Sequence, residues 1–294
     1  MEIYQTESLE DIIYESTNKR KLTLDIIKPI NQDTQSYPAI IYVHGGGWMA
    51  GDKKGPGGEW NASFAQYGFV CININYRLSG EAIFPAALID VKTAICWVRE
   101  HADEYQIDPN KIGIWGHSSG GHLASLAALT SNHSELSSPY SSVSDHVRAA
   151  VSLSGPTDLA KMGTWHDFPN SPEAKFLGGA VQTKLELAKK ANPITYCNED
   201  KTIPFLIIHG DNDPICPVNQ SELLHQALPN STYLNIKGAD HDLVGGNITF
   251  DEILEIIRGF FTRQLVKRSM GVMELMQHRK AVKEAVSWFI NSSK

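Results

Sequence analysis

The sequence predicts an α/β fold with a mostly parallel central sheet, an antiparallel N-terminal hairpin and helices on both faces. Short apolar runs typical of buried strands recur along the 294 residues, and segments with helical periodicity separate them. Only the first two strand-like segments are separated by a short polar break instead. Strands that alternate with helices of this length form βαβ units with parallel strands, whereas a short turn joins an antiparallel pair.

The N-terminal hairpin is predicted from residues 11–15 and 21–26, which flank the polar residues 16–20. In the second segment, leucine and isoleucine side chains alternate with polar ones. This alternation indicates a strand with one buried face. We expect the hairpin to form an antiparallel edge of the sheet.

The other predicted strands and helices follow in alternation. Apolar runs predict strands at residues 39–43, 69–74, 111–115, 147–155, 204–208 and 232–236. Helical spacing predicts helices at residues 59–67, after Pro85, at residues 123–129, 185–191 and 250–265. The last of these is strongly amphipathic, with an apolar face formed by Ile253, Ile256, Ile257, Phe260 and Phe261.

A serine flanked by glycines, Ser118, lies between a predicted strand and a predicted helix, within Gly-His-Ser-Ser-Gly-Gly at residues 116–121. A strand that turns into a helix within a few residues brings backbone segments close together. Gly116 and Gly120 remove the side chains that would obstruct such a turn. Ser118 is therefore expected at the tip of a tight elbow, next to the positive end of the following helix.

Three consecutive glycines follow an earlier strand, within His-Gly-Gly-Gly-Trp at residues 44–48. Glycines let the backbone approach a ligand and turn its N–H groups toward it, as an oxyanion hole requires. A phosphate-binding loop is the competing interpretation. However, Asp52 stands where that loop needs a lysine, and its charge would repel phosphate. The oxyanion hole is therefore preferred.

An aspartate and a histidine follow two later strands. Asp213 lies in an acid-rich turn after the strand at residues 204–208, and His241 lies in the loop after the strand at residues 232–236. The order Ser118, Asp213, His241, with each residue beyond the end of a strand, is the order of nucleophile, acid and base in an α/β-hydrolase and differs from that of chymotrypsin.

With these motifs the chain resembles the α/β-hydrolases. It is most similar to the carboxylesterase branch related to hormone-sensitive lipases and to bifunctional feruloyl and acetylxylan esterases. The resemblance implies that the serine, aspartate and histidine form a catalytic triad, and that the N–H groups of Gly46, Gly47 and Ser119 form the oxyanion hole. Relatives of hormone-sensitive lipase carry a helical cap where this chain has its hairpin, so a more open pocket is expected.

The residue types predict a serine carboxylesterase that acts on small to medium acyl esters without a metal or organic cofactor. A serine hydroxyl is a poor nucleophile at neutral pH, so Ser118 needs His241 as its base, and Asp213 would orient that imidazole. The resemblance makes acetyl or feruloyl esters of plant polysaccharides candidate substrates. An amidase, arylformamidase or short-peptide hydrolase could use the same triad, and a non-catalytic ligand-binding module on the same fold is a further hypothesis.

The segment at residues 156–203 lacks regular periodicity and is predicted to form a lid or pocket rim. Ring-bearing residues in and near it are candidates to line the substrate pocket, namely Trp48, His117, Trp165, Phe168 and Phe176. The aromatic residues within the segment could instead pack it onto the sheet.

Other acids and histidines near these motifs have structural interpretations. Asp211 could replace Asp213 as the triad acid, but it is predicted to cap its turn. Asp240 and Asp242 flank His241 without matching a metal-binding motif, so they are interpreted as solvated loop acids. The histidines interpreted as structural or packing residues are His44, His122 and His209.

Composition limits the expected partners and compartment. A net charge of −7 without a basic block argues against nucleic acid and gives no sign of a membrane-surface site. The four cysteines are too dispersed for a zinc motif or a disulfide framework. No secretory signal or membrane-spanning segment is apparent, so we expect a cytoplasmic protein, or a secreted one whose signal peptide was removed. The expected partner is a small-molecule ester.

Residues 267–294 extend beyond the segment that carries the resemblance, so we divide the chain into a hydrolase domain at residues 1–266 and a C-terminal tail. Apolar residues recur in the tail and predict a helix. Such a helix packs back on the domain or joins two subunits into a homo-oligomer.

If the tail joins subunits, deleting residues 267–294 will lower the oligomeric size, because the apolar residues that bridge the subunits are lost. Sedimentation velocity of the truncated and full-length proteins measures this change. An unchanged sedimentation profile would contradict the interface.

Overall fold

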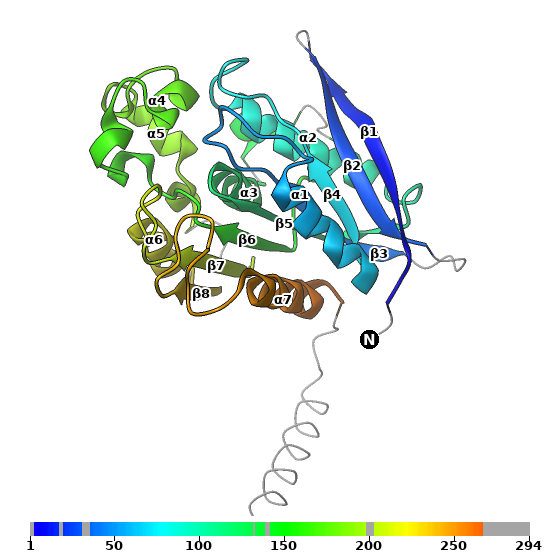
Figure 1. Cartoon of the computed structure of the whole chain (residues 1–294). Helices are drawn as coiled ribbons and strands as arrows, with labels where there is room; N and C mark the ends of the chain where they lie inside the picture. The colour runs from blue at the N-terminus through cyan, green and yellow to red at the C-terminus, as the bar shows by residue number, and fades with distance from the viewer. Residues whose placement is uncertain are drawn as a thin grey trace, which may run out of the picture.

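One sheet forms the centre of the protein (Figure 1). Its eight strands are β1 (Thr6–Ser16), β2 (Lys21–Pro29), β3 (Tyr37–Val43), β4 (Val70–Ile74), β5 (Ile107–His117), β6 (Ala149–Leu153), β7 (Phe205–Gly210) and β8 (Ser231–Ile236). The computed structural model describes residues 3–17, 20–30, 36–131, 133–138, 142–197 and 203–266. The predicted tail at residues 267–294 and part of the predicted turn at residues 16–20 therefore lie outside the described residues.

The strands lie in the order β1-β2-β4-β3-β5-β6-β7-β8. β1 pairs antiparallel with β2, and β2 pairs antiparallel with β4. The pairs from β4 through β8 are all parallel. The predicted fold class, a mostly parallel sheet with an antiparallel N-terminal hairpin, is confirmed.

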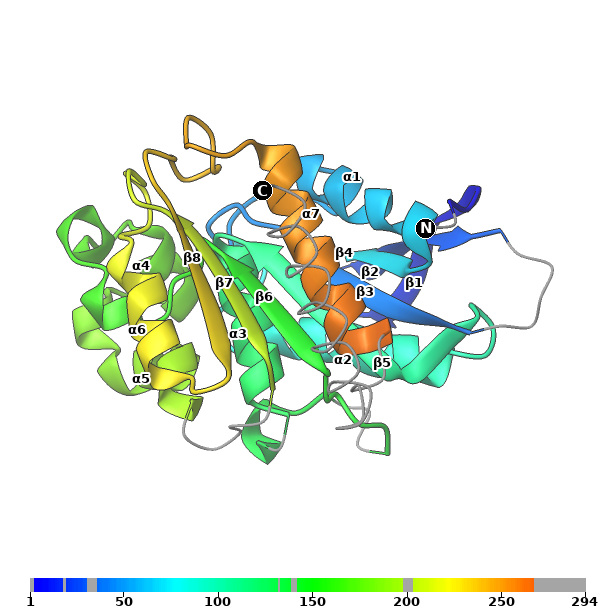
Figure 2. The same cartoon turned by 90° about the horizontal axis from the view of Figure 1, so that it is seen from below.

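Helices cover both faces of the sheet (Figure 2). The α-helices are α1 (Pro56–Ala62), α2 (Ala86–Glu100), α3 (Ser119–Leu129), α4 (Pro172–Leu177), α5 (Leu185–Ala191), α6 (Asn219–Ala227) and α7 (Phe250–Phe261). Short 3₁₀ turns are η1 (Ser63–Tyr67), η2 (Ser134–Leu136), η3 (Leu159–Lys161), η4 (Thr164–Asp167), η5 (Val181–Thr183) and η6 (Pro193–Tyr196), and a π-helical turn, η7 (Thr262–Val266), follows α7.

The strand β3 illustrates how the sheet is buried on both sides. Ile41 and Val43 pack into one apolar cluster with α2 and α3, whereas Ile40 and Tyr42 pack into a second cluster with α7. Successive side chains of a strand point to opposite faces, so a strand covered on both faces needs a continuous apolar run. This requirement explains why the runs found in the sequence mark the central strands.

Several predicted boundaries shift by a few residues. The helix predicted at residues 59–67 begins at Pro56 and changes to the turn η1 at Ser63. The helix predicted at residues 250–265 is α-helical only to Phe261. The insertion at residues 156–203 contains α4, α5 and short 3₁₀ turns but no strand within its described residues, 156–197 and 203.

The four cysteines are free and buried. Among the described helices, none combines the length and the apolar character that crossing a membrane requires.

The packing of α7 on β5 depends on a glycine. A Cβ atom built on Gly113 of β5 would lie 2.6 Å from Cε1 of Phe261, so only a residue without a side chain leaves room for this ring. Phe261 is fully buried, whereas Ile256, predicted to lie on the same apolar face, is 39% exposed.

Phe261→Ala is expected to lower the free energy of unfolding by about 3–5 kcal/mol, because it leaves a cavity over β5. Ile256→Ala on the same helix is the matched control and is expected to change it by about 0.5 kcal/mol. Urea denaturation of both variants measures the difference. Equal losses in the two variants would show that α7 is not anchored through Phe261.

Candidate active site

Ser118 stands at the junction between β5, which ends at His117, and α3, which begins at Ser119. Its backbone has φ 57° and ψ −125°, a conformation that is strained for a residue with a side chain. The neighbouring backbones are very close, because a Cβ atom on Gly116 would lie 2.4 Å from Gly120, and one on Gly120 would lie 2.1 Å from the carbonyl oxygen of Val43. The glycines therefore permit the elbow that the sequence predicted.

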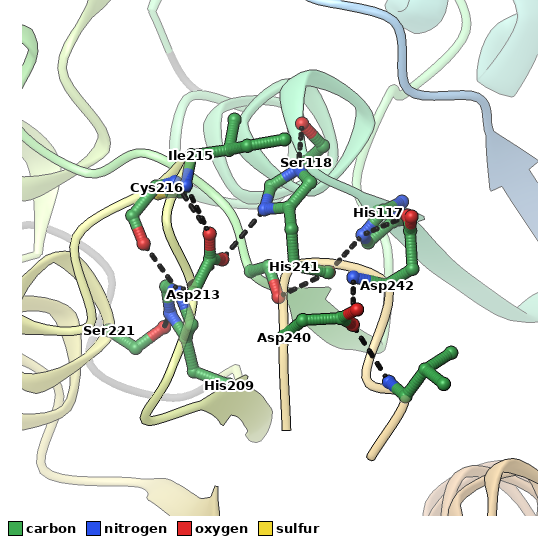
Figure 3. Close-up of polar contacts among 12 residues, drawn as sticks. His117, Ser118, His209, Asp213, Ile215, Cys216, Ser221, Asp240, His241 and Asp242 are labelled. Carbon is green, nitrogen blue, oxygen red and sulfur yellow. Dashed lines mark hydrogen bonds and ion pairs between the residues drawn. The ribbon is translucent and has the colours of Figure 1, made fainter. Parts of the chain in front are cut away.

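The structure brings Ser118, His241 and Asp213 together in one hydrogen-bonded chain (Figure 3). His241 Nδ1 lies 2.6 Å from Asp213 Oδ2, and His241 Nε2 lies 2.9 Å from Ser118 Oγ. A carboxylate only accepts hydrogen bonds, so Nδ1 carries the proton and Nε2 is free to accept the serine proton. The side chain of His241 is 9% exposed and that of Asp213 is fully buried.

Asp213 is held by donors on both of its carboxylate oxygens. The backbone N–H groups of Ile215 and Cys216 donate to Oδ1 at 2.7 and 2.8 Å, and His209 and His241 donate to Oδ2. Burial by itself raises the pKa of this carboxyl group, but the hydrogen bonds from His209, His241 and the Cys216 N–H, together with the charge interaction with His241, hold the pKa below its usual value. Asp213 is therefore charged at neutral pH.

The main chain of His241 is fixed separately from its side chain. His117 Nε2 donates to the carbonyl oxygen of His241 at 2.8 Å, and the Ser154 hydroxyl donates to the same oxygen at 3.2 Å. Burial and the nearby His241 lower the pKa of His117 to about 4. A neutral His117 ring therefore supports the loop that carries His241.

The glycine loop after β3 has a conformation that requires glycine. Gly46 has φ 113° and Gly47 has φ 60°, and a Cβ atom on Gly46 would lie 2.2 Å from the carbonyl oxygen of Ala50. The Tyr76 hydroxyl holds the loop by donating to the carbonyl oxygen of His44 at 2.9 Å. Within the described residues, no group accepts a hydrogen bond from the N–H of Gly46 or Gly47. These two N–H groups are available to a ligand.

A cavity of about 560 Å³ lies beside Ser118 and the glycine loop. Its lining includes Ser118, His241, Gly46, Gly47 and Ser119, the first residue of α3. The first N–H groups of a helix have no acceptor within the helix, so the N–H of Ser119 is a further donor on the cavity wall. The insertion contributes other parts of the wall, namely Pro156, Met162, Trp165, His166, Pro172 and Glu173.

Only some of the residues predicted to line the pocket do so in the structure. Trp165 and His117 line the cavity. Trp48 also contributes to the lining but is only 2% exposed, because its ring stacks on Phe176 at 4.6 Å and lies mainly in the core. Phe176 itself is buried in that core and does not line the cavity. The prediction for Phe168 was wrong: it follows the turn η4, is 62% exposed and is absent from the cavity wall.

Two other acids near His241, Asp211 and Asp240, accept hydrogen bonds from backbone N–H groups. Asp211 Oδ1 accepts the N–H of Gly238 at 2.6 Å, as expected for a turn cap. Asp240 Oδ1 accepts the N–H groups of Asp242 and Val244. In the part of the chain that the structure describes, no group of three His, Cys, Asp or Glu side chains is arranged to hold a metal ion.

Sequence reasoning missed a buried pair in the cavity wall. His166 Nδ1 lies 2.8 Å from Glu173 Oε1, and His166 Nε2 donates to the carbonyl oxygen of Ile215 at 2.8 Å. The pair therefore ties the insertion to the loop that carries Asp213. The sequence contained no signal for it, because the two residues come from the separate short elements η4 and α4 and the third partner is a distant backbone carbonyl.

Comparison with known families and proteins gives consistent matches. A family model described as BD-FAE matches residues 24–228, and one described as a TAP-like protein matches residues 185–291. The chain is 35% identical to a probable carboxylic ester hydrolase, LipM, of Mycobacterium tuberculosis, over 67% of this chain and 46% of that protein. The chain spans about half the length of the curated relatives that it matches.

Two solved structures are similar to this chain over most of its length. A truncated form of a carbohydrate esterase from gut microbiota is 34% identical with a TM-score of 0.78, and the match covers 90% of this chain and 98% of that one. A bifunctional GH43-CE protein of Bacteroides eggerthii is 33% identical with a TM-score of 0.79, and the match covers 88% of this chain and 35% of that one.

His122, in the first turn of α3, is expected to make the stability of the protein depend on pH. Its ring is fully buried between Trp48, which donates to Nδ1, and the carbonyl oxygen of Ala191, which accepts from Nε2. Burial lowers the pKa of His122 from 6.5 to about 4. The unfolded chain therefore binds a proton in this range that the folded protein excludes.

Protonation of His122 in the unfolded chain is expected to lower the free energy of unfolding by about 3 kcal/mol as the pH drops from about 6.5 to about 4. Urea denaturation across this range measures the slope. His122→Gln, which does not titrate, is expected to have a smaller slope than the wild type. An equal slope in both proteins would contradict the assignment of this proton to His122.

Proposed function

Because this chain belongs to the BD-FAE family of α/β-hydrolase esterases, we propose that it hydrolyses carboxylic esters with Ser118 as nucleophile, His241 as base and Asp213 as the orienting acid. The observation that carries the proposal is the hydrogen-bonded chain from Asp213 through His241 to Ser118, which ends at the wall of a cavity of about 560 Å³. A pocket of this size accommodates a small or medium acyl group together with part of its alcohol.

In the proposed reaction, Ser118 Oγ attacks the ester carbonyl carbon while His241 Nε2 accepts the hydroxyl proton. The imidazolium that forms is stabilised by Asp213, whose charge the surrounding donors maintain. His241 then gives the proton to the leaving alcohol, and an acyl group remains on Ser118. Water, activated by His241 in the same way, releases the acid and restores the serine.

Negative charge develops on the carbonyl oxygen in the tetrahedral intermediate. We assign the N–H groups of Gly46, Gly47 and Ser119 to this oxygen, because all three residues line the cavity beside Ser118. Each such donor typically stabilises the transition state by about 3–4 kcal/mol. The donors are fixed before the substrate arrives, since the glycine loop and the helix start are held by other contacts.

For the substrate we propose small to medium acyl esters of carbohydrates, including acetyl or feruloyl esters of plant polysaccharides. Support comes from the match to a carbohydrate esterase that is covered over 98% of its length. The cavity also carries the partly exposed Trp165 at its rim, and a flat aromatic ring of this kind can pack against a sugar or an aromatic acyl group.

Ser118→Ala is expected to lower kcat/KM for p-nitrophenyl acetate by about four orders of magnitude or more, because the nucleophile is lost. Ser125→Ala on the same helix is the matched control and is expected to retain turnover, since its hydroxyl only donates to the carbonyl oxygen of Gly121. Initial rates on p-nitrophenyl esters from acetate to decanoate measure both effects.

The same assay with acetylated and feruloylated xylo-oligosaccharides and with formanilide tests the substrate class. We expect turnover of short esters and of the esterified sugars above that of formanilide. Full activity in Ser118→Ala would contradict the assignment of Ser118 as nucleophile. Turnover of formanilide without turnover of any ester would show that the protein is an amidase and not an esterase.

A further inference from the structure

Asp213 receives a hydrogen bond from a second histidine that lies outside the chain formed with His241 and Ser118 (Figure 3). His209, near the end of β7, places Nε2 3.0 Å from Asp213 Oδ2, the same oxygen that His241 contacts. The other carboxylate oxygen accepts two backbone N–H groups. The Asp213 carboxylate therefore has four donors, and two of them are imidazoles.

The protonation of His209 follows from its neighbours. Nε2 also lies 3.0 Å from the carbonyl oxygen of Cys216, and both of its neighbours, this oxygen and the Asp213 carboxylate, can only accept. Nε2 must therefore carry a proton. Nδ1 lies 2.7 Å from the hydroxyl of Ser221, which is able to donate to it. The ring of His209 is fully buried, so water does not compete for these contacts.

The contact with Asp213 exceeds what His209 needs for its own burial. Ser221 on α6 and the carbonyl oxygen of Cys216 already provide a partner for each ring nitrogen. The additional bond joins β7, α6 and the turn after β7 at the carboxylate. It also offsets the cost of burying a charge on Asp213, since an N–H donor favours the ionised form.

We propose that His209, oriented by Ser221, is a positioning residue that holds the Asp213 carboxylate in place against His241 and disperses part of its charge. The proposal rests on the function proposed above, in which His241 is the base. Charge dispersal matters because Asp213 must keep the proton on Nδ1 of His241 without binding the imidazolium so tightly that His241 stays protonated at neutral pH.

Other ionisable groups lie around this network. The thiol of Cys216 is buried beside Asp213, and burial raises the pKa of this thiol well above its usual value. The ring of His117 packs against that of His241, with 4.9 Å between the ring centroids. Asp242 Oδ1 lies 3.8 Å from His117 Nε2. Within the described residues, the hydrogen bonds of the His209 ring go to Ser221, Asp213 and the carbonyl oxygen of Cys216, and none goes to the Cys216 thiol, His117 or Asp242. Substitution of His209 is therefore expected to act on His241 through Asp213.

The experiment compares His209→Leu, His209→Gln and Ser221→Ala with the wild type, using kcat/KM for p-nitrophenyl acetate across pH. His209→Leu removes the donor to Asp213, and we expect kcat/KM to fall about tenfold to one hundredfold. A Gln carboxamide carries both a donor group, NH2, and an acceptor group, C=O, as a neutral imidazole carries N–H and N, so His209→Gln is expected to recover most of this loss. Ser221→Ala is expected to lose about two- to tenfold.

The acid limb of the pH profile distinguishes positioning from packing. Without the His209 donor, the Asp213 carboxylate attracts the imidazolium form of His241 more strongly, and this attraction moves the acid limb of the profile to higher pH. We expect the acid limb to move up by at least about 0.5 unit in His209→Leu and less in Ser221→Ala. A residue that only packs would lower the fraction of folded enzyme, measured by active-site titration, and leave the acid limb unchanged.

Proton NMR supplies a readout that does not need turnover. The proton between His241 Nδ1 and Asp213 is expected to shift to lower field in His209→Leu and to return toward the wild-type position in His209→Gln. If His209→Leu does not fold, the acid limb and the proton resonance are compared in His209→Gln, Ser221→Ala and the wild type. An acid limb and a proton resonance that stay unchanged in every folded variant would overturn the positioning role. A wild type without ester turnover would instead overturn the proposed function, while the resonance still tests the His209 bond.

Discussion

The close contact between the elbow after β5 and the end of β3 is the constraint on which the rest of the site depends. A Cβ atom on Gly120 would lie 2.1 Å from the carbonyl oxygen of Val43, so α3 can start here only because this position has no side chain. The contact places Ser118 and the first N–H of α3 beside the glycine loop that follows β3. The nucleophile and the N–H donors proposed for the oxyanion hole therefore depend on one packing arrangement.

The parallel sheet extends this arrangement across four strands. The groups of the site follow the carboxyl ends of β3, β5, β7 and β8, and these ends meet along one edge of the sheet, where α/β proteins place their ligand sites. Both faces of the sheet are buried, so the strands cannot slide without exposing apolar side chains. A rigid core thus sets the spacing between Ser118, Asp213 and His241.

Buried polar contacts then determine the orientation of each group. His117 and Ser154 hold the carbonyl of His241, and His209 adds a donor to Asp213. In a buried environment each unmade hydrogen bond is costly, so these contacts favour one arrangement of the site. The insertion joins the same network, because His166 binds the carbonyl of Ile215 two residues after Asp213.

The sequence alone determined the fold class, the elbow, the glycine loop and the three residues of the hydrogen-bonded chain. Each has a local signature, such as an apolar run, a glycine at a tight turn or an acid at a strand end. Tertiary structure decided which side chains meet. In the folded protein Trp48 lies largely in the core, Phe168 is exposed to solvent, and His209 donates a hydrogen bond to Asp213. Such contacts depend on side-chain direction and on elements distant in the chain, and a pattern in the sequence records neither.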